Sequence, residues 1–157
     1  MKKQWIEAFG KMTYGIYVLT TFHEDEINGM IASWVSQISY DPPLVMIAVH
    51  SNRYSHQLIE RSGCFALHVI DNTQGEMIDR MMGPDPGMKF DGMDWHPGRT
   101  GSPIINECLA WFDCTVKEQH RPGNHTVFFG QIVDAGSLAS GRPLITHDCE
   151  GMYIGNS

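Results

Sequence analysis

The sequence lacks the short motifs that identify several common classes of enzyme. It contains no G-x-G-x-x-G, so a Rossmann-type dinucleotide site is not predicted, and no G-x-S-x-G, so the nucleophile elbow of a serine hydrolase is not predicted either. No H-E-x-x-H, H-x-H or C-x-x-C occurs among its 8 histidines and 4 cysteines. A metal centre is therefore not expected, and no metal ligands are assigned.

The chain also lacks a basic segment and a long apolar run. Its net charge is −7 at pH 7, and no block of Lys or Arg offers a surface for nucleic acid or an anionic membrane. No stretch approaches the roughly 20 apolar residues that a transmembrane helix requires. Residues 1–12 have neither the apolar centre nor the cleavage site of a signal peptide. We therefore expect a cytoplasmic protein that binds neither nucleic acid nor membrane.

The cysteines are too few and too scattered to indicate a disulfide framework. They are Cys64, Cys108, Cys114 and Cys149. Disulfides are rare in the cytoplasm, and free cysteine is among the most buried residue types. We expect four reduced, mostly buried thiols.

The 157 residues are expected to form one domain that spans 1–157. The 16 glycines and 8 prolines predict many turns, which favours a mainly-β fold. The polar segment 23–29 predicts a turn in which Asn28 and Gly29 adopt positive φ. Apolar patterns predict strands at 14–22, 30–39, 44–50, 64–71, 109–120 and 125–138, short helices at 3–12, 53–61 and 73–82, a long loop at 83–103 and a last short pairing within 143–154. Helices do not follow strands regularly, so this order indicates a small barrel or sandwich with peripheral helices.

One hydroxyl-rich segment, "ASWVS", precedes a double proline and a plain apolar strand. Its candidate residues are Ala32, Ser33, Trp34 and Ser36. Small side chains let a ligand approach the backbone, and hydroxyl and amide groups can hydrogen-bond a flat ring with heteroatoms at its edge. A strand with ordinary surface serines accounts for the same pattern and remains open.

A second polar group lies where a strand is predicted to end and a helix to begin. Its residues are Ser51, Asn52, Arg53 and Ser55. The first amides of a helix and its positive dipole end suit a phosphate, and arginine can add a bidentate contact. Capping of the helix by Ser51 or Asn52 is the alternative.

Two further residues could carry chemistry. Lys89 lies in the long loop before an aromatic residue, and His125 begins a strand directly after a turn. A lysine there could contact a phosphate or an anionic ring, and a histidine held by a rigid element can donate to a ring or position a substrate. A solvated lysine and a histidine without a role are the alternatives.

Taken in order, these segments resemble the flavin reductase-like, FMN-binding split-barrel family. The resemblance rests on A-S-W-V-S-Q-I-S-Y-D-P-P, S-N-R-Y-S, M-K-F-D-G and N-H-T-V-F-F-G, and it runs from about Gly10 to Ile145. Within the family, it is strongest to the FMN domains fused to rubredoxin or flavodiiron proteins. The family often has Thr at the position of Ser55 and Asp at that of Asn124. The related pyridoxamine-phosphate oxidase branch shares the barrel, but the segment 32–43 resembles the reductase branch.

The resemblance implies a split β-barrel with short peripheral helices, and a homodimer with FMN near the subunit interface. His125 would stand beside the flavin ring as the catalytic residue, and either Lys89 or a protonated His125 would stabilise negative charge on the ring. Cofactor contacts would come from Ala32, Ser33, Trp34 and Ser36 along the flavin, from Ser51, Asn52, Arg53 and Ser55 at the phosphate or ribityl chain, from Lys89 at the phosphate or ring, and from Tyr153 near the ring.

The implied function is transfer of hydride or electrons from NAD(P)H through FMN to free flavin or to an acceptor protein. Two alternatives stay open. One is an electron-transfer flavoprotein of the flavoredoxin type, which takes electrons from a redox carrier protein. The other is a flavin-binding module without turnover.

Overall fold

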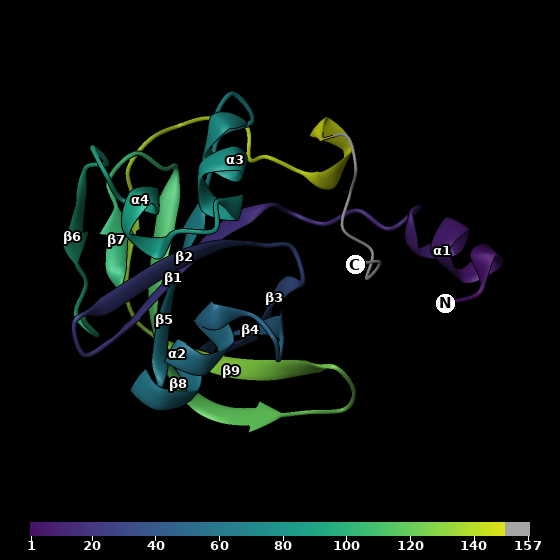
Figure 1. Cartoon of the computed structure of the whole chain (residues 1–157), viewed down its shortest axis with the longest axis horizontal. Helices are drawn as coiled ribbons and strands as arrows, with labels where there is room; N and C mark the ends of the chain where they lie inside the picture. The colour runs from purple at the N-terminus through teal and green to yellow at the C-terminus, as the bar shows by residue number, and fades with distance from the viewer. Residues whose placement is uncertain (150–157) are drawn as a thin grey trace.

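The computed structural model describes residues 1–149 and consists mainly of antiparallel β-strands (Figure 1). Seven strands form one sheet in the order β2-β1-β5-β8-β9-β4-β3, and β6 pairs with β7 in a second sheet. The prediction of a mainly-β protein with short helices is confirmed. The strands are β1 (Tyr17–His23), β2 (Glu26–Ala32), β3 (Val35–Tyr40), β4 (Pro43–His50), β5 (Cys64–Val69), β6 (Trp95–Pro97), β7 (Pro103–Ile105), β8 (Ala110–His120) and β9 (His125–Ser137).

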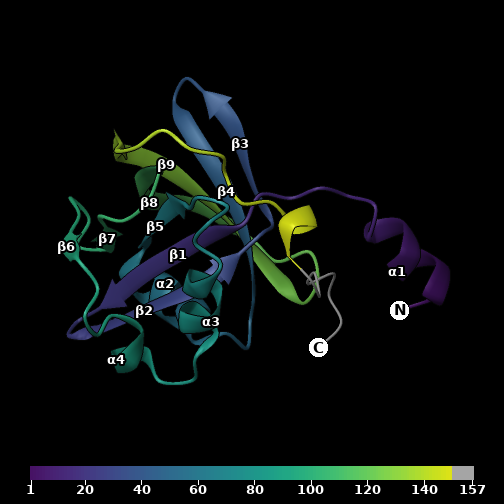
Figure 2. The ribbon, with the colours of Figure 1, turned by 90° about the horizontal axis from the view of Figure 1, so that it is seen from above.

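The helices are short and lie outside the main sheet. Figure 2 shows α2, α3 and α4 on the side of β1 and β2, while α1 stands away from the rest of the chain. None of the helices within residues 1–149 combines the length and the apolar character that a bilayer span needs. They are α1 (Lys3–Phe9), α2 (Tyr54–Ser62), α3 (Glu76–Met82), α4 (Pro86–Lys89) and the 3₁₀ turn η1 (Thr146–Asp148).

The main sheet is strongly curled. Its two edge strands, β2 and β3, are consecutive in the chain and are separated only by Ser33 and Trp34. Such a link spans at most about 11 Å, so both edges must approach each other. The Ala48 amide of β4 donates to the Trp34 carbonyl at 3.0 Å and fixes the link. The curled sheet encloses a core whose fully buried members include Leu19, Ile47, Phe65, Leu67 and Phe128.

The predicted turn at 23–29 is wrong in its position. The hairpin of β1 and β2 turns at Glu24 and Asp25, and Glu24 takes the positive φ of 54°. Asn28 and Gly29 lie inside β2, where they pair with Thr21 and Thr20. Gly29 is needed for space, because a Cβ there would lie 2.5 Å from the Met81 sulfur.

Other boundaries also differ from the prediction. The expected strand 30–39 is two strands, because β2 ends at Ala32 and β3 begins at Val35 on the opposite edge of the sheet. The expected loop 83–103 contains α4 and β6 and reaches β7. The last pairing is limited to bridges from Pro143 and Ile145, and its remainder beyond residue 149 lies outside the described residues.

The four cysteines are free thiols, as predicted. Cys64, Cys108 and Cys114 are buried, and Cys149 is partly buried. Burial, with a smaller contribution from the nearby Asp113 carboxylate, raises the pKa of Cys114 to about 12. The Cys114 thiol is therefore protonated at neutral pH and acts as an unreactive packing group.

Packing of β9 against β5 predicts one sensitive glycine. A Cβ at Gly130 would lie 2.5 Å from the buried Phe65 ring. We expect Gly130→Ala to lower the free energy of unfolding by about 1–3 kcal/mol through overpacking. Gly123→Ala is the matched control, since nothing lies within 4 Å of its Cβ position. Urea denaturation measures both, and equal midpoints would contradict this account.

Because His68 is buried, we expect the stability of the fold to depend on pH. Its Nδ1 lies 3.1 Å from the Val18 carbonyl and its Nε2 accepts from the Ile105 amide at 3.0 Å, so the ring is neutral and protonated at Nδ1. Complete burial lowers its pKa to about 4. Since the unfolded chain protonates near pH 6.5, stability falls as pH drops from there, by about 3 kcal/mol near pH 4. Urea denaturation across this range should show a shallower fall in His68→Gln; identical slopes would refute the assignment.

Candidate functional site

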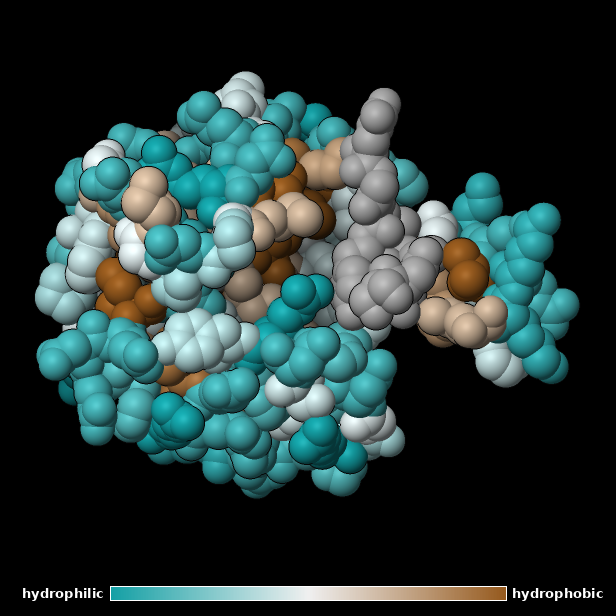
Figure 3. All heavy atoms as spheres, in the orientation of Figure 1, coloured by the Kyte–Doolittle hydropathy of each residue, from teal (hydrophilic) through white to brown (hydrophobic). Residues whose placement is uncertain are grey.

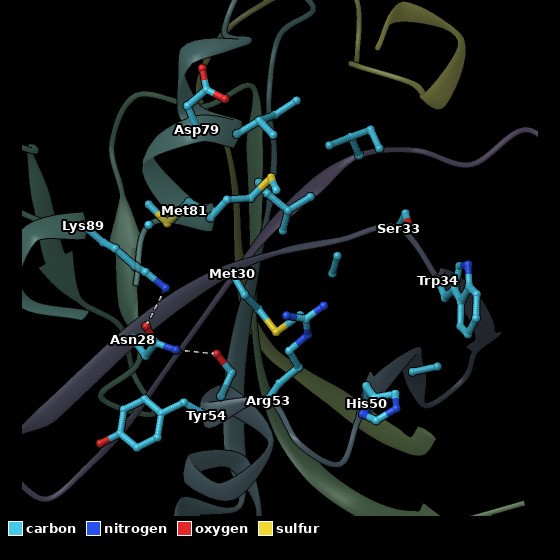
Figure 4. A pocket seen from close by; sticks show the side chains of 18 of the residues that line it. Asn28, Met30, Ser33, Trp34, His50, Arg53, Tyr54, Asp79, Met81 and Lys89 are labelled. Carbon is cyan, nitrogen blue, oxygen red and sulfur yellow. Dashed lines mark hydrogen bonds between the residues drawn. The ribbon is translucent and has the colours of Figure 1, made fainter. Parts of the chain in front are cut away.

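A cavity of about 680 Å³ opens beside the link between β2 and β3. Its walls come from β2, the link, the ends of β4 and β9, the start of α2, and the helices α3 and α4. In the space-filling view, hydrophobic side chains gather in the hollowed middle of the face (Figure 3). Met30 lies centrally among the lining side chains, with Lys89 and Asn28 on one side and Trp34 and His50 on the other (Figure 4).

The cavity brings together most of the residues that the sequence singled out. Ser36 does not line it, because it lies on exposed β3 and donates to the Gln37 carbonyl. Ser51 does not line it either, and its amide donates to the Asn124 carbonyl at 3.2 Å. Tyr153 lies outside the described residues. The predicted residues that do line the cavity are Ala32, Ser33, Trp34, Asn52, Arg53, Ser55, Lys89 and His125.

Helix α2 begins at the cavity without a side-chain cap. Its N-cap is Arg53, and no side chain accepts from the first-turn amides within the described residues. The Asn52 amide instead donates to His50 Nδ1 at 3.2 Å. Capping by Ser51 or Asn52, the alternative reading of this segment, is therefore wrong. The start of α2 presents its positive dipole end next to Arg53.

Lys89 is 7% exposed and is held by β2. Its ammonium donates to Asn28 Oδ1 at 3.1 Å and to the Gly29 carbonyl at 2.8 Å, and Asn28 Nδ2 donates to Ser55 Oγ at 2.9 Å. Burial lowers the pKa of Lys89, and the charge of Arg53 lowers it further. Within residues 1–149, no carboxylate lies within 4.0 Å of either cation. An anion between Lys89 and Arg53 would offset both the burial of the ammonium and the repulsion between the two positive charges.

His125 lies at the other end of the cavity in an aromatic group. Its ring is 4.5 Å from the Trp34 ring at 40°, and 4.9 Å from the His50 ring at 81°. Its Nδ1 is 2.8 Å from Asn124 Oδ1. Burial, and then the charges of His50 and Arg53, lower its pKa, so the ring is neutral at pH 7. A protonated His125, one of the two expected sources of positive charge, is therefore disfavoured, and the lysine and arginine that line the cavity are Lys89 and Arg53.

Several lining residues were missed from the sequence. Asn28 was assigned to a turn, although it links Lys89 to Ser55. Met30, Met81 and His50 also line the cavity, and no sequence pattern singles them out. The signal that could have found Asn28 is a buried position in a strand, which requires a partner for its amide.

Sequence and structure comparisons place this chain in a known family. The family model of the flavin reductase like domain matches residues 9–153. The chain therefore belongs to the flavin reductase-like family. It is 36% identical over 94% of its length to the reductase subunit HsaB of a flavin-dependent monooxygenase from Mycobacterium tuberculosis, of which 79% is covered. It is 30% identical over 97% of its length to the ferric-chelate reductase (NAD(P)H) of Archaeoglobus fulgidus, of which 92% is covered.

Solved structures show the same fold. Component B of nitrilotriacetate monooxygenase from Mycobacterium thermoresistibile aligns with a TM-score of 0.84 and 33% identity, over 91% of this chain and 80% of that one. The NADH:FAD oxidoreductase SgcE6 of Streptomyces globisporus, in complex with NAD and FAD fragments, aligns with a TM-score of 0.82 and 27% identity, over 90% and 86% of the two chains.

The aromatic end of the cavity predicts a shift in one titration. Because the charge of His50 lowers the pKa of His125, we expect His50→Gln to raise it. Titration of the histidine resonances by NMR measures the effect. His120→Gln, at an exposed position at the end of β8, is the control and should leave the His125 pKa unchanged. An unchanged His125 pKa in His50→Gln would show that the two rings do not interact.

Proposed function

We propose that this protein is an NAD(P)H-dependent flavin oxidoreductase that binds FMN in the cavity. The observation that carries the proposal is that Lys89, Arg53 and the uncapped start of α2 all face one cavity, with no carboxylate pairing with either cation in residues 1–149. Such a set of groups suits a phosphate. The aromatic pair of Trp34 and His125 at the other end suits a flat ring.

The residues fit a phosphorylated, ring-bearing cofactor in their chemistry. Lys89, Arg53 and Ser55 would hold the phosphate, with Asn52 beside them. Ala32 and Ser33 leave room for the flavin to lie along the link between β2 and β3. Bound FMN accepts a hydride from a reduced nicotinamide and passes electrons on. Neutral His125 would orient the arriving donor, and Trp34 holds the His125 ring in place.

The relatives support the choice of reaction. One is named as a monooxygenase reductase subunit, one as a ferric-chelate reductase that uses NAD(P)H, and SgcE6 as an NADH:FAD oxidoreductase. By analogy, this chain would reduce free flavin or an acceptor protein.

We further propose a split-barrel homodimer in the cytoplasm, with FMN near the subunit interface as the family resemblance implies.

A second candidate function is electron transfer without NAD(P)H. It is favoured by the likeness to a high molecular weight rubredoxin of Moorella thermoacetica, at 27% identity over 88% of this chain and 62% of that one. In that case a redox carrier protein would supply the electrons. A flavin-binding module without turnover is the third possibility.

One measurement separates these functions. The visible spectrum of the protein purified without added flavin is recorded, and NADH or NADPH is then added without oxygen. We expect a yellow protein, or one that becomes yellow with FMN, that is bleached quickly by at least one of the two nucleotides. A yellow protein that responds to neither would favour the electron carrier, and one that binds no FMN would refute the proposal.

The phosphate assignment predicts a difference between two flavins. We expect Lys89→Met and Arg53→Met each to weaken FMN binding roughly tenfold or more, because each removes a charged hydrogen bond. Riboflavin, which lacks the phosphate, should lose little affinity. Quenching of flavin fluorescence measures both dissociation constants. Lys117→Met, at an exposed position on β8, is the control. Equal losses for both flavins would remove these residues from the phosphate site.

A further inference from the structure

Asn28 lies between Lys89 and Ser55, at the part of the cavity that we propose binds the phosphate. It is 4% exposed, and its carboxamide bridges Lys89 of α4 and Ser55 of α2 (Figure 4). The three side chains come from three separate elements, and all three line the cavity. The bridge itself is nearly inaccessible, because Lys89 is 7% exposed and Ser55 is 1% exposed.

The chemistry of the three groups fixes the direction of each hydrogen bond. An ammonium has donors only, so the Asn28 atom that faces Lys89 must be Oδ1. The other end of the carboxamide is then Nδ2, which can only donate, so Ser55 Oγ must accept. A serine hydroxyl carries a single proton. With Oγ accepting from Asn28, that proton has to point away from Asn28.

Among residues 1–149, the same count leaves one N–H group of Lys89 without an acceptor. Its ammonium has three N–H groups, and Asn28 Oδ1 and the Gly29 carbonyl account for two of them. Both the third N–H group and the Ser55 proton belong to residues that line the cavity. The start of α2, where Ser55 lies, adds its positive dipole end.

We infer that Asn28 is a positioning residue that couples Lys89 to Ser55. The charge of Lys89 sets the orientation of the carboxamide, and that orientation turns the Ser55 hydroxyl into a donor for the phosphate. Without the ammonium, the carboxamide can rotate by half a turn and accept the Ser55 proton itself. The inference rests on the proposed function, since the phosphate is that of FMN.

A double-mutant cycle tests the coupling. The probes are FMN and riboflavin, and the variants are Ser55→Ala, Lys89→Met and the double variant. In the wild-type background, Ser55→Ala should weaken FMN binding roughly tenfold, because a hydrogen bond to a charged group is lost. In the Lys89→Met background, the same change should cost less than about twofold, because the hydroxyl no longer donates to the phosphate. Riboflavin binding should be nearly constant throughout.

The outcomes separate the inference from the proposed function. Additive effects of the two changes on FMN binding would overturn the coupling and leave the phosphate site intact. A wild-type protein that binds FMN no more tightly than riboflavin would overturn the phosphate site, and the coupling with it.

A second variant tests Asn28 directly. In Asn28→Asp, the carboxylate would pair with Lys89 and also accept the Ser55 proton, so both donors are withdrawn from the phosphate. We expect the preference for FMN over riboflavin to fall at least tenfold. Asn106→Asp adds the same charge where Asn106 contacts His96, outside the cavity, and should keep the preference. An Asn28→Asp protein with an unchanged preference would refute the role of Asn28.

Discussion

The two residues between β2 and β3 have to join strands that lie at opposite edges of one sheet. A link of this length cannot cross a flat seven-stranded sheet, so the sheet must curl until its edges meet. The curl brings Ser33 and Trp34 next to the ends of β4 and β9, where His50 and His125 pair. The position of the cavity follows from this constraint, because its walls are the elements that the link draws together.

The cavity carries positive charge because of which side chains line it, since the chain as a whole is acidic. The chain has 18 acidic residues against 11 basic ones, so its composition would allow a carboxylate to pair with buried Lys89. Within residues 1–149 none lies within 4.0 Å of Lys89 or Arg53, although Asp79 lines the same cavity. The fold instead satisfies the ammonium with an amide oxygen and a backbone carbonyl. These groups solvate a charge without cancelling it, which leaves the charge for a ligand.

The sequence predicted the mainly-β class because apolar alternation and turn residues are local signals. It failed at the link, since nothing local in residues 30–39 shows that the segment forms two strands at opposite edges of the sheet. Asn28 was misread for a related reason: Asn-Gly is typical of a turn, but here Gly29 makes room for Met81 and Asn28 holds Lys89. Nearly all the candidate residues stand out segment by segment, but each segment taken alone has an ordinary explanation, and only the family resemblance joins them into one site. Their convergence on one cavity depends on the tertiary structure, which cannot be predicted from any single segment.

The neutral amide of Asn28 gives the buried Lys89 ammonium a partner and still leaves its positive charge to bind a phosphate. Burial of the Lys89 ammonium lowers its pKa, so the charged form costs folding free energy in the absence of an anion. A carboxylate would reduce that cost, but it would also neutralise the site and repel a phosphate. An amide oxygen gives the ammonium a partner and leaves its charge in place. Phosphate binding would then offset the cost of burial, so affinity for the phosphate and stability of the fold are linked through the same three side chains.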